Sequence, residues 1–82
     1  MPDIARTPRQ IGALIRRKRK HLGLSQRVLG ERVGLRQETI SLIETGNPAT
    51  RIDTLLAVLA TLDLEFRITA RSRDPDVADL VD

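Results

Sequence analysis

Side chains that can hydrogen-bond to DNA bases gather on one face of a short segment, residues 37–45. If this segment is a helix, Ile40 and Ile43 form an inward apolar pair. The outward face then holds polar residues and one leucine, with two more polar residues on its flanks: Glu38, Ser41, Leu42 and Thr45, then Gln37 and Thr39. Amides, a carboxylate and hydroxyls are the groups that read base edges in a major groove. The pattern therefore predicts a surface that recognises DNA.

Positive charge is concentrated before this segment. Residues 6–36 contain ten Lys or Arg and one acid, whereas residues 37–82 contain four basic and nine acidic residues. The net charge is only +3, so the charge is distributed very unevenly along the chain. This asymmetry predicts that the first half faces a polyanion, and the alternative is an ordinary solvated surface. The exposed cations that face phosphates should be Arg16, Arg17, Lys18 and Lys20.

A first helix should begin at Thr7. Threonine is a good capping residue, Pro8 suits the first helical position, and Gln10 lies three residues after the cap. The helix should run to about Leu22 and stop at Gly23. Its apolar stripe is predicted to be Ile11, Leu14, Ile15 and Leu22.

Arg19 lies on that apolar stripe, four residues after Ile15. An inward arginine needs a carboxylate, because an unpaired buried charge is costly. Glu44 is the predicted partner, since it lies beside Ile40 and Ile43 on the inward side of residues 37–45. We therefore predict a structural ion pair between Arg19 and Glu44.

Two further helices should follow, joined by a tight turn. Ser25 can cap the second helix, which should end before Gly34, a residue that can take the positive φ of a sharp turn. Gly30 should let the third helix pack closely across the second. The third helix should begin near Arg36, which is a poor capping residue.

A fourth helix is predicted after the turn signal at residues 46–48. Thr50 can cap it. Apolar residues then recur with helical period and should supply much of the core: Ile52, Leu55, Leu56, Leu59 and Leu62.

Residues 64–70 change period. Leu64, Phe66 and Ile68 alternate with polar residues, which is the pattern of a half-buried strand. A lone strand cannot satisfy its backbone groups, and no other part of the chain has a strand pattern. Pairing with the same strand of a second copy is therefore predicted, in an isologous dimer. The alternative is an extension of the fourth helix or an extended tail.

Composition excludes several other classes of function. The chain has no cysteine, which excludes disulfides and thiolate metal sites, and its 82 residues suit a single domain. It has neither a run of membrane-spanning length nor a signal core, so we expect a cytoplasmic protein. His21 is the only histidine, and no carboxylate pair, phosphate loop or metal-ligand spacing is present. We therefore expect no enzymatic activity, no metal and no cofactor.

The chain resembles a known family in the residues of the predicted turn and third helix. The matching residues are Leu24-Ser25-Gln26, Gly30, Gly34, Gln37-Glu38-Thr39-Ile40-Ser41 and Glu44-Thr45-Gly46. They resemble the helix-turn-helix of the Cro and phage-repressor (XRE) family over residues 21–62. The strand pattern directly after the last helix is more particularly similar to the HipB-type antitoxins, whose strands form a small sheet between subunits. Members of that group bind a HipA-type kinase toxin and repress their own operon.

The resemblance also implies roles for individual residues. Base-reading residues would be Gln37, Glu38, Thr39 and Leu42. A phosphate contact would be Gln26. Together with the cations of residues 15–20, the full set of predicted phosphate contacts is Gln26, Arg27, Arg36, Ser41, Arg16, Arg17 and Lys20. Two residues depart from the family pattern. Arg36 stands where a small hydroxyl or acid is common, and Glu38 puts a carboxylate into a groove that tolerates it mainly opposite a cytosine amine.

The expected fold class is an all-α, lambda-repressor-like helix-turn-helix domain of four to five helices, with one short C-terminal β-strand paired across a homodimer. The predicted boundaries are 1–6 for an N-terminal arm, 7–62 for the DNA-binding domain, 63–70 for the dimerisation strand and 71–82 for a flexible tail. Expected partners are palindromic operator DNA, a second copy and a HipA-like kinase toxin. Two alternatives stay open: a phage-type repressor without a toxin, and a protein-binding module whose DNA binding is vestigial.

Overall fold

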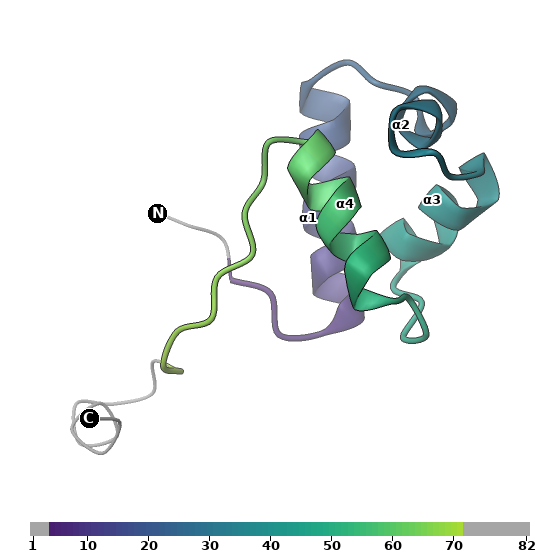
Figure 1. Cartoon of the computed structure of the whole chain (residues 1–82). Coiled ribbons are helices and arrows are strands. Elements are labelled where there is room, and N and C mark those ends of the chain that lie inside the picture. The colour runs from purple at the N-terminus through teal and green to yellow at the C-terminus, as the bar shows by residue number, and fades with distance from the viewer. Residues whose placement is uncertain (1–3, 72–82) are drawn as a thin grey trace.

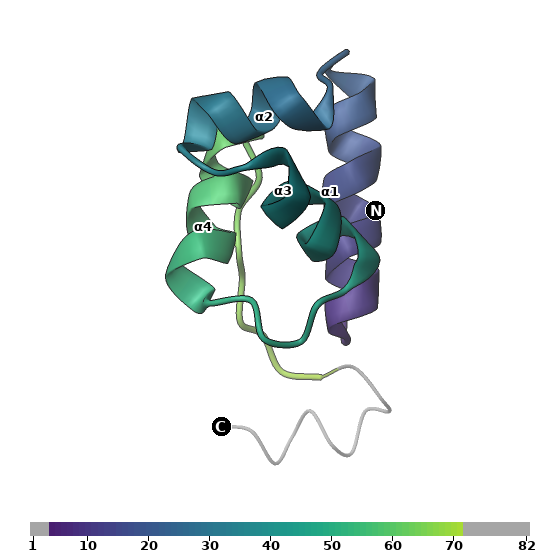
Figure 2. The same cartoon turned by 90° about the vertical axis from the view of Figure 1, so that its right-hand side faces the viewer.

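A computed structural model describes residues 4–71, which form four α-helices and no strand. The helices are α1 (Pro8–His21), α2 (Gln26–Val33), α3 (Gln37–Thr45) and α4 (Ile52–Thr61). Figure 2 shows α3 in front of α1 and α4, with α2 crossing above them. None of the helices in this part of the chain has the length and apolar character needed to cross a membrane.

Helix α1 begins and ends where the sequence predicts. The Thr7 hydroxyl accepts a hydrogen bond from the backbone N–H of Gln10 at 3.1 Å, and Pro8 occupies the first turn. The helix ends at His21, and Gly23 takes a φ of +72° just beyond it. Leu22, predicted on the apolar stripe, is instead exposed, because the chain turns at Gly23 and Leu24 packs against the core in its place.

A left-handed glycine joins α2 to α3. Ser25 caps α2 by accepting from the N–H of Val28 at 3.0 Å, and Gly34 closes the helix with a φ of +82°. A side chain at Gly30 would lie 2.6 Å from the carbonyl oxygen of Leu35. The close approach predicted at Gly30 is therefore made to the turn itself, before α3 begins.

One hydrophobic core lies among the four helices. Each helix contributes buried aliphatic side chains, and the residue after α4 completes the set: Ile15, Leu29, Ile40, Ile43, Val58, Leu59 and Leu62. Two residues predicted for this core, Ile52 and Leu56, are exposed instead. Ile52 is the first residue of α4 and Leu56 lies one turn further on, so the helix buries fewer of its apolar residues than its composition suggests.

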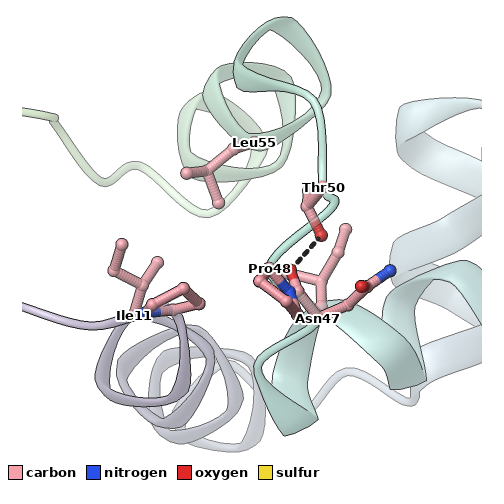
Figure 3. A pocket seen from close by; sticks show the side chains of 7 residues that line it. Ile11, Asn47, Pro48, Thr50 and Leu55 are labelled. Atoms are coloured by element: carbon pink, nitrogen blue, oxygen red, sulfur yellow. Dashed lines mark hydrogen bonds between the residues drawn. The ribbon is translucent and has the colours of Figure 1, made fainter.

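The turn between α3 and α4 is closed by its own polar groups. The Thr50 hydroxyl donates to the carbonyl oxygen of Asn47 at 3.0 Å, as Figure 3 shows. The prediction that Thr50 caps α4 is therefore wrong. The helix begins after Arg51, one residue later than a cap at Thr50 would place it. Behind this turn, Ile11 and Leu55 face a cavity of about 80 Å³. It is far smaller than the roughly 300–1,000 Å³ of small-molecule sites.

The first turn of α4 holds an exposed ion pair. Arg51 Nε donates to Asp53 Oδ1 at 3.1 Å, and the N–H of Thr54 donates to the same oxygen at 2.8 Å. The hydrogen bonds from Arg51, and then that from Thr54, lower the pKa of the Asp53 carboxyl below its ordinary value. A negative charge here is also favoured by the dipole at the helix start.

Residues 64–71 follow α4 without helix or strand. The chain leaves the helix at Asp63, which has a φ of +58°, so the alternative of a longer fourth helix is wrong. Leu64 packs against the core, whereas Phe66 and Ile68 are 52% and 89% exposed. The predicted strand is not formed in the single chain, because its backbone groups find no partner strand within residues 4–71. Pairing with a second copy stays a prediction, and residues 72–82 of the predicted flexible tail, 71–82, lie outside the described residues.

Candidate nucleic-acid interface

The inner face of α3 fixes the position of its outer face. Ile40 is fully buried, Ile43 is 4% exposed, and α3 packs against both α1 and α2. Because a helix is a rigid element, these two anchors determine which side chains point to solvent. The outer face is thereby held in front of the molecule in the view of Figure 2.

The side chains predicted to read bases lie on this outer face. Gln37 and Glu38 are exposed in the first turn, Thr39 is half-buried, and Leu42 is 53% exposed one turn further on. Ser41 lies beside them and is half-buried. This places an amide, a carboxylate and an aliphatic side chain together on one exposed helix surface. These are groups that can meet an adenine edge, a cytosine amine and a thymine methyl.

Thr45 lies on the same face but has a local role. Its hydroxyl lies 3.1 Å from both the Ser41 and the Leu42 carbonyl oxygens, to which it can donate. The hydroxyl hydrogen is therefore used within α3 itself. The part of the outer face that is predicted to read bases consequently ends near Leu42.

A buried ion pair ties α3 to α1. Arg19 Nε donates to Glu44 Oε2 at 2.7 Å, and a terminal guanidinium nitrogen donates to Oε1 at 3.0 Å. The two side chains are 8% and 2% exposed. This two-pronged geometry is the strong form of an arginine–carboxylate contact. It fixes both the distance between the helices and the rotation of α3.

Two more groups complete this polar cluster. The third side-chain donor of Arg19 reaches the Leu24 carbonyl oxygen at 2.7 Å, and Gln26 Nε2 donates to Glu44 Oε1 at 3.2 Å. Within residues 4–71, no buried side-chain nitrogen or oxygen is left without a hydrogen bond. A fully satisfied cluster of this kind is rigid, so it links α1, the start of α2 and the end of α3 into one unit.

Gly12 is a positioning residue that the sequence did not reveal. A side chain there would overlap the carbonyl oxygen of Ile43 and lie 2.6 Å from that of Glu44. Helix α1 therefore approaches the last turn of α3 as closely as a glycine allows. Nothing in the neighbouring sequence distinguishes Gly12 from other helix positions. Only its contact with α3 reveals its role.

Exposed basic side chains lie on α1, on α2 and immediately before α3. Arg16 and Lys20 are exposed one turn apart on α1, and Arg17 beside them is exposed as well. Arg36 is exposed immediately before α3, whose start has no side-chain capping hydrogen bond. An uncapped helix start next to an arginine is favourable for an anionic group such as a phosphate.

Two predicted phosphate contacts have protein partners. Arg27 on α2 forms an ion pair with Glu31 at 2.6 Å, with side chains 68% and 63% exposed. A solvent-exposed pair contributes little stability, so a phosphate can displace Glu31 at low cost. Gln26 donates to Glu44, but its amide nitrogen carries a second hydrogen that remains for a phosphate.

Similarity to a known protein family agrees with this geometry. The helix-turn-helix family HTH_3 matches residues 15–68, which is well over half of the chain and includes α2, the turn at Gly34 and α3. No curated protein matches the chain.

Proposed function

Because the chain belongs to the HTH_3 family of helix-turn-helix proteins, we propose that it is a sequence-specific transcriptional repressor that binds operator DNA as a homodimer. One observation carries the proposal: the buried cluster of Arg19 and Glu44 holds α3 so that Gln37, Glu38 and Leu42 face solvent together. An exposed helix of this kind fits a major groove.

In the proposed complex, α3 reads the bases. The Gln37 amide both accepts from and donates to an adenine edge, and Leu42 packs against a thymine methyl. Glu38 accepts from a cytosine amine, which would exclude a guanine or thymine at that position. Thr39 is half-buried and contributes a hydroxyl at the edge of the contact.

The surrounding cations fix the register of α3 on the duplex. The proposed phosphate contacts are the cations and polar groups on α1, α2 and the start of α3: Arg16, Arg17, Lys20, Gln26, Arg27, Arg36 and Ser41. Such contacts carry affinity and salt dependence but little sequence information. The exposure of Arg16 and Lys20 on α1, Arg27 on α2 and Arg36 before α3 supports the proposal that these elements contact the DNA backbone.

The test is selection from a random-sequence DNA pool, followed by titration of the selected duplex and of an unselected duplex. A specific reader should bind its selected site roughly 10³-fold or more tightly than unselected DNA at moderate salt. Enrichment of no sequence, with equal binding to both duplexes, would contradict sequence-specific repression. It would instead favour a module whose main partner is a protein.

We also propose that the repressor is the HipB-like antitoxin of a toxin–antitoxin operon and binds a HipA-like kinase toxin. Besides the sequence resemblance, the exposed aliphatic residues Ile52 and Leu56 on α4 support a protein partner. The test is whether the adjacent reading frame encodes a kinase-like protein that copurifies with this chain. A neighbour of another kind would favour the alternative of a phage-type repressor without a toxin.

A further inference from the structure

In Figure 1 the segment 64–71 runs on the side of α1 away from α3. A groove is lined mainly by residues of this segment, of α1 and of the stretch before α1. Its volume is about 1310 Å³. This exceeds the roughly 300–1,000 Å³ of small-molecule sites, so a stretch of polypeptide fits it better than a small ligand does. Six aliphatic side chains line it: Ile4, Ile11, Leu14, Leu59, Leu64 and Ile68.

The groove is also strongly positive. Its lining has one carboxylate, Glu65, and five cations: Arg6, Arg17, Lys18, Arg67 and Arg71. Glu65 is already engaged by Arg67 at 2.8 Å. An aliphatic lining with an excess of cations suits an occupant that is both apolar and acidic.

The chain itself continues with such a sequence. Residues 72–82 read SRDPDVADLVD, with four aspartates and a single arginine. Val77, Leu80 and Val81 have the i, i+3, i+4 spacing of one helix face, and the aspartates occupy other positions. The segment therefore combines apolar and acidic character in the proportions that the groove requires.

We propose that residues 74–82 dock in this groove of their own chain. The aspartates lie against the cations of α1 and of residues 67–71, and Val77, Leu80 and Val81 cover the aliphatic side chains of α1, which leaves Ile68 to the contact with a second copy. Arg71 is itself part of the lining, so only two residues separate the groove from the docking segment. A tether this short gives the docking segment an effective concentration of roughly millimolar at the groove. A weak contact can therefore form within one molecule.

Docking has a consequence for DNA binding that rests on the proposed function. Arg17 lines the groove and is also a proposed phosphate contact. Aspartates placed beside α1 would compete with phosphates for the positive field of this helix. The acidic segment would then act as a built-in competitor that lowers affinity for any DNA sequence.

Docking itself can be tested without DNA. The chain has no cysteine, so Ala78→Cys provides a single site for a spin label on the full-length protein. In ¹H–¹⁵N NMR spectra, the spin label broadens the amide signals of nearby residues. The signals of Leu14, Lys18 and Leu64 should therefore lose most of their intensity. Those of Glu38 and Ser41, on the far side of the molecule, should keep theirs. Undiminished intensities of Leu14 and Lys18 at low salt would overturn the proposal.

A matched variant separates charge complementarity from chance proximity. In this variant of the labelled protein, the four aspartates of residues 74–82 are changed to asparagine. The segment keeps its size and tether but loses its negative charges. The intensity losses at Leu14 and Lys18 should largely disappear in it. They should also weaken at 1 M salt, where the screening length falls to about 3 Å from about 10 Å at 0.1 M. Losses that persist unchanged in the variant would overturn the electrostatic proposal.

Mixing experiments distinguish the chain's own groove from that of a second copy. Labelled protein without ¹⁵N is mixed with unlabelled ¹⁵N protein, so that only contacts between molecules cause intensity loss. Intact signals at Leu14 and Lys18 in the mixture support docking within one chain. Losses as large as those in the labelled ¹⁵N protein would overturn it in favour of exchange between subunits.

The consequence for DNA is measured separately on an unselected duplex. If the docked form is about 90% populated, the asparagine variant should bind roughly tenfold more tightly than the natural sequence. Equal affinity of the two proteins would overturn the competition. If neither protein binds DNA, the proposed function fails, while the spin-label result still decides whether the segment docks.

Discussion

The two faces of α3 are built from different chemistry and serve different purposes. The inner face carries Ile40, Ile43 and Glu44, all buried, and the outer face carries Gln37 and Leu42, both exposed. Residues that determine where the helix lies are therefore separate from the residues that we propose to read bases. This separation allows the outer face to change its sequence preference while the fold stays intact.

Two ion pairs, one between α1 and α3 and one within α2, show how burial changes the contribution of a charged pair to stability. Arg19–Glu44 and Arg27–Glu31 have nearly equal lengths, 2.7 and 2.6 Å, but the first pair is buried and the second is exposed. Removing one partner from a buried pair leaves an uncompensated charge, whereas an exposed charge is solvated by water. Substitutions at the two pairs should consequently differ greatly in their effect on stability.

The largest expected effect is that of Glu44→Ala. It leaves the Arg19 guanidinium buried without its carboxylate and should lower the free energy of unfolding by about 3–5 kcal/mol. Urea denaturation measures this change. Glu31→Ala is the matched control and should change the free energy of unfolding by about 1 kcal/mol or less. Similar losses in the two variants would contradict the distinction between the pairs.

Exposed residues of the segment 64–71, like those on the outer face of α3, should affect binding to a partner more than the stability of the fold. Phe66→Asp combined with Ile68→Asp should leave unfolding nearly unchanged but convert dimers to monomers in sedimentation. Affinity for a two-half-site operator should then fall roughly 10²–10⁴-fold, because the second half-site contact is no longer intramolecular. Thr69→Asp, which adds charge at a polar position of the same segment, should retain the dimer. Dimers of the double variant would refute pairing through this segment.

Gly12→Ala tests the close contact between α1 and α3. Helix propensity alone favours alanine over glycine by about 1 kcal/mol, so an unconstrained site would gain stability. Here the added methyl group meets the Ile43 and Glu44 carbonyls, and we expect a loss of about 1–3 kcal/mol, measured by urea denaturation. Ala13→Gly on the exposed side of α1 should lose about 1 kcal/mol. A stabilised Gly12→Ala variant would show that the helices can move apart without cost.

The sequence predicts the elements better than it predicts the contacts between them. The start of α1 at Thr7 and the turn at Gly34 follow from local chemistry, because a capping hydroxyl and a positive φ involve only neighbouring residues. The matched family and the four helices agree with the predicted helix-turn-helix class. Arg19 and Glu44 could be paired in advance because both are charged residues on inward stripes.

Other features depend on tertiary structure that no local pattern encodes. The role of Gly12 arises from a carbonyl more than thirty residues away along the chain, at Ile43. The exposure of Leu22 depends on the turn that the chain makes after α1, and that of Leu56 depends on which side of α4 meets the core. The donation from Gln26 to Glu44 requires α2 and α3 to be placed first, so a residue predicted only for phosphate binding also supports the ion pair.

The most direct test of the central claim compares Gln37→Ala with Arg17→Ala. Each protein is titrated with its selected duplex and with an unselected duplex at several salt concentrations. Gln37→Ala should lose about 1–3 kcal/mol of binding free energy on the selected duplex alone, with its salt slope unchanged. Arg17→Ala should weaken binding to both duplexes and reduce the salt slope by about one unit. If Gln37→Ala weakens both duplexes equally, α3 is not the reading helix, and the assignment of its outer face to base recognition is wrong.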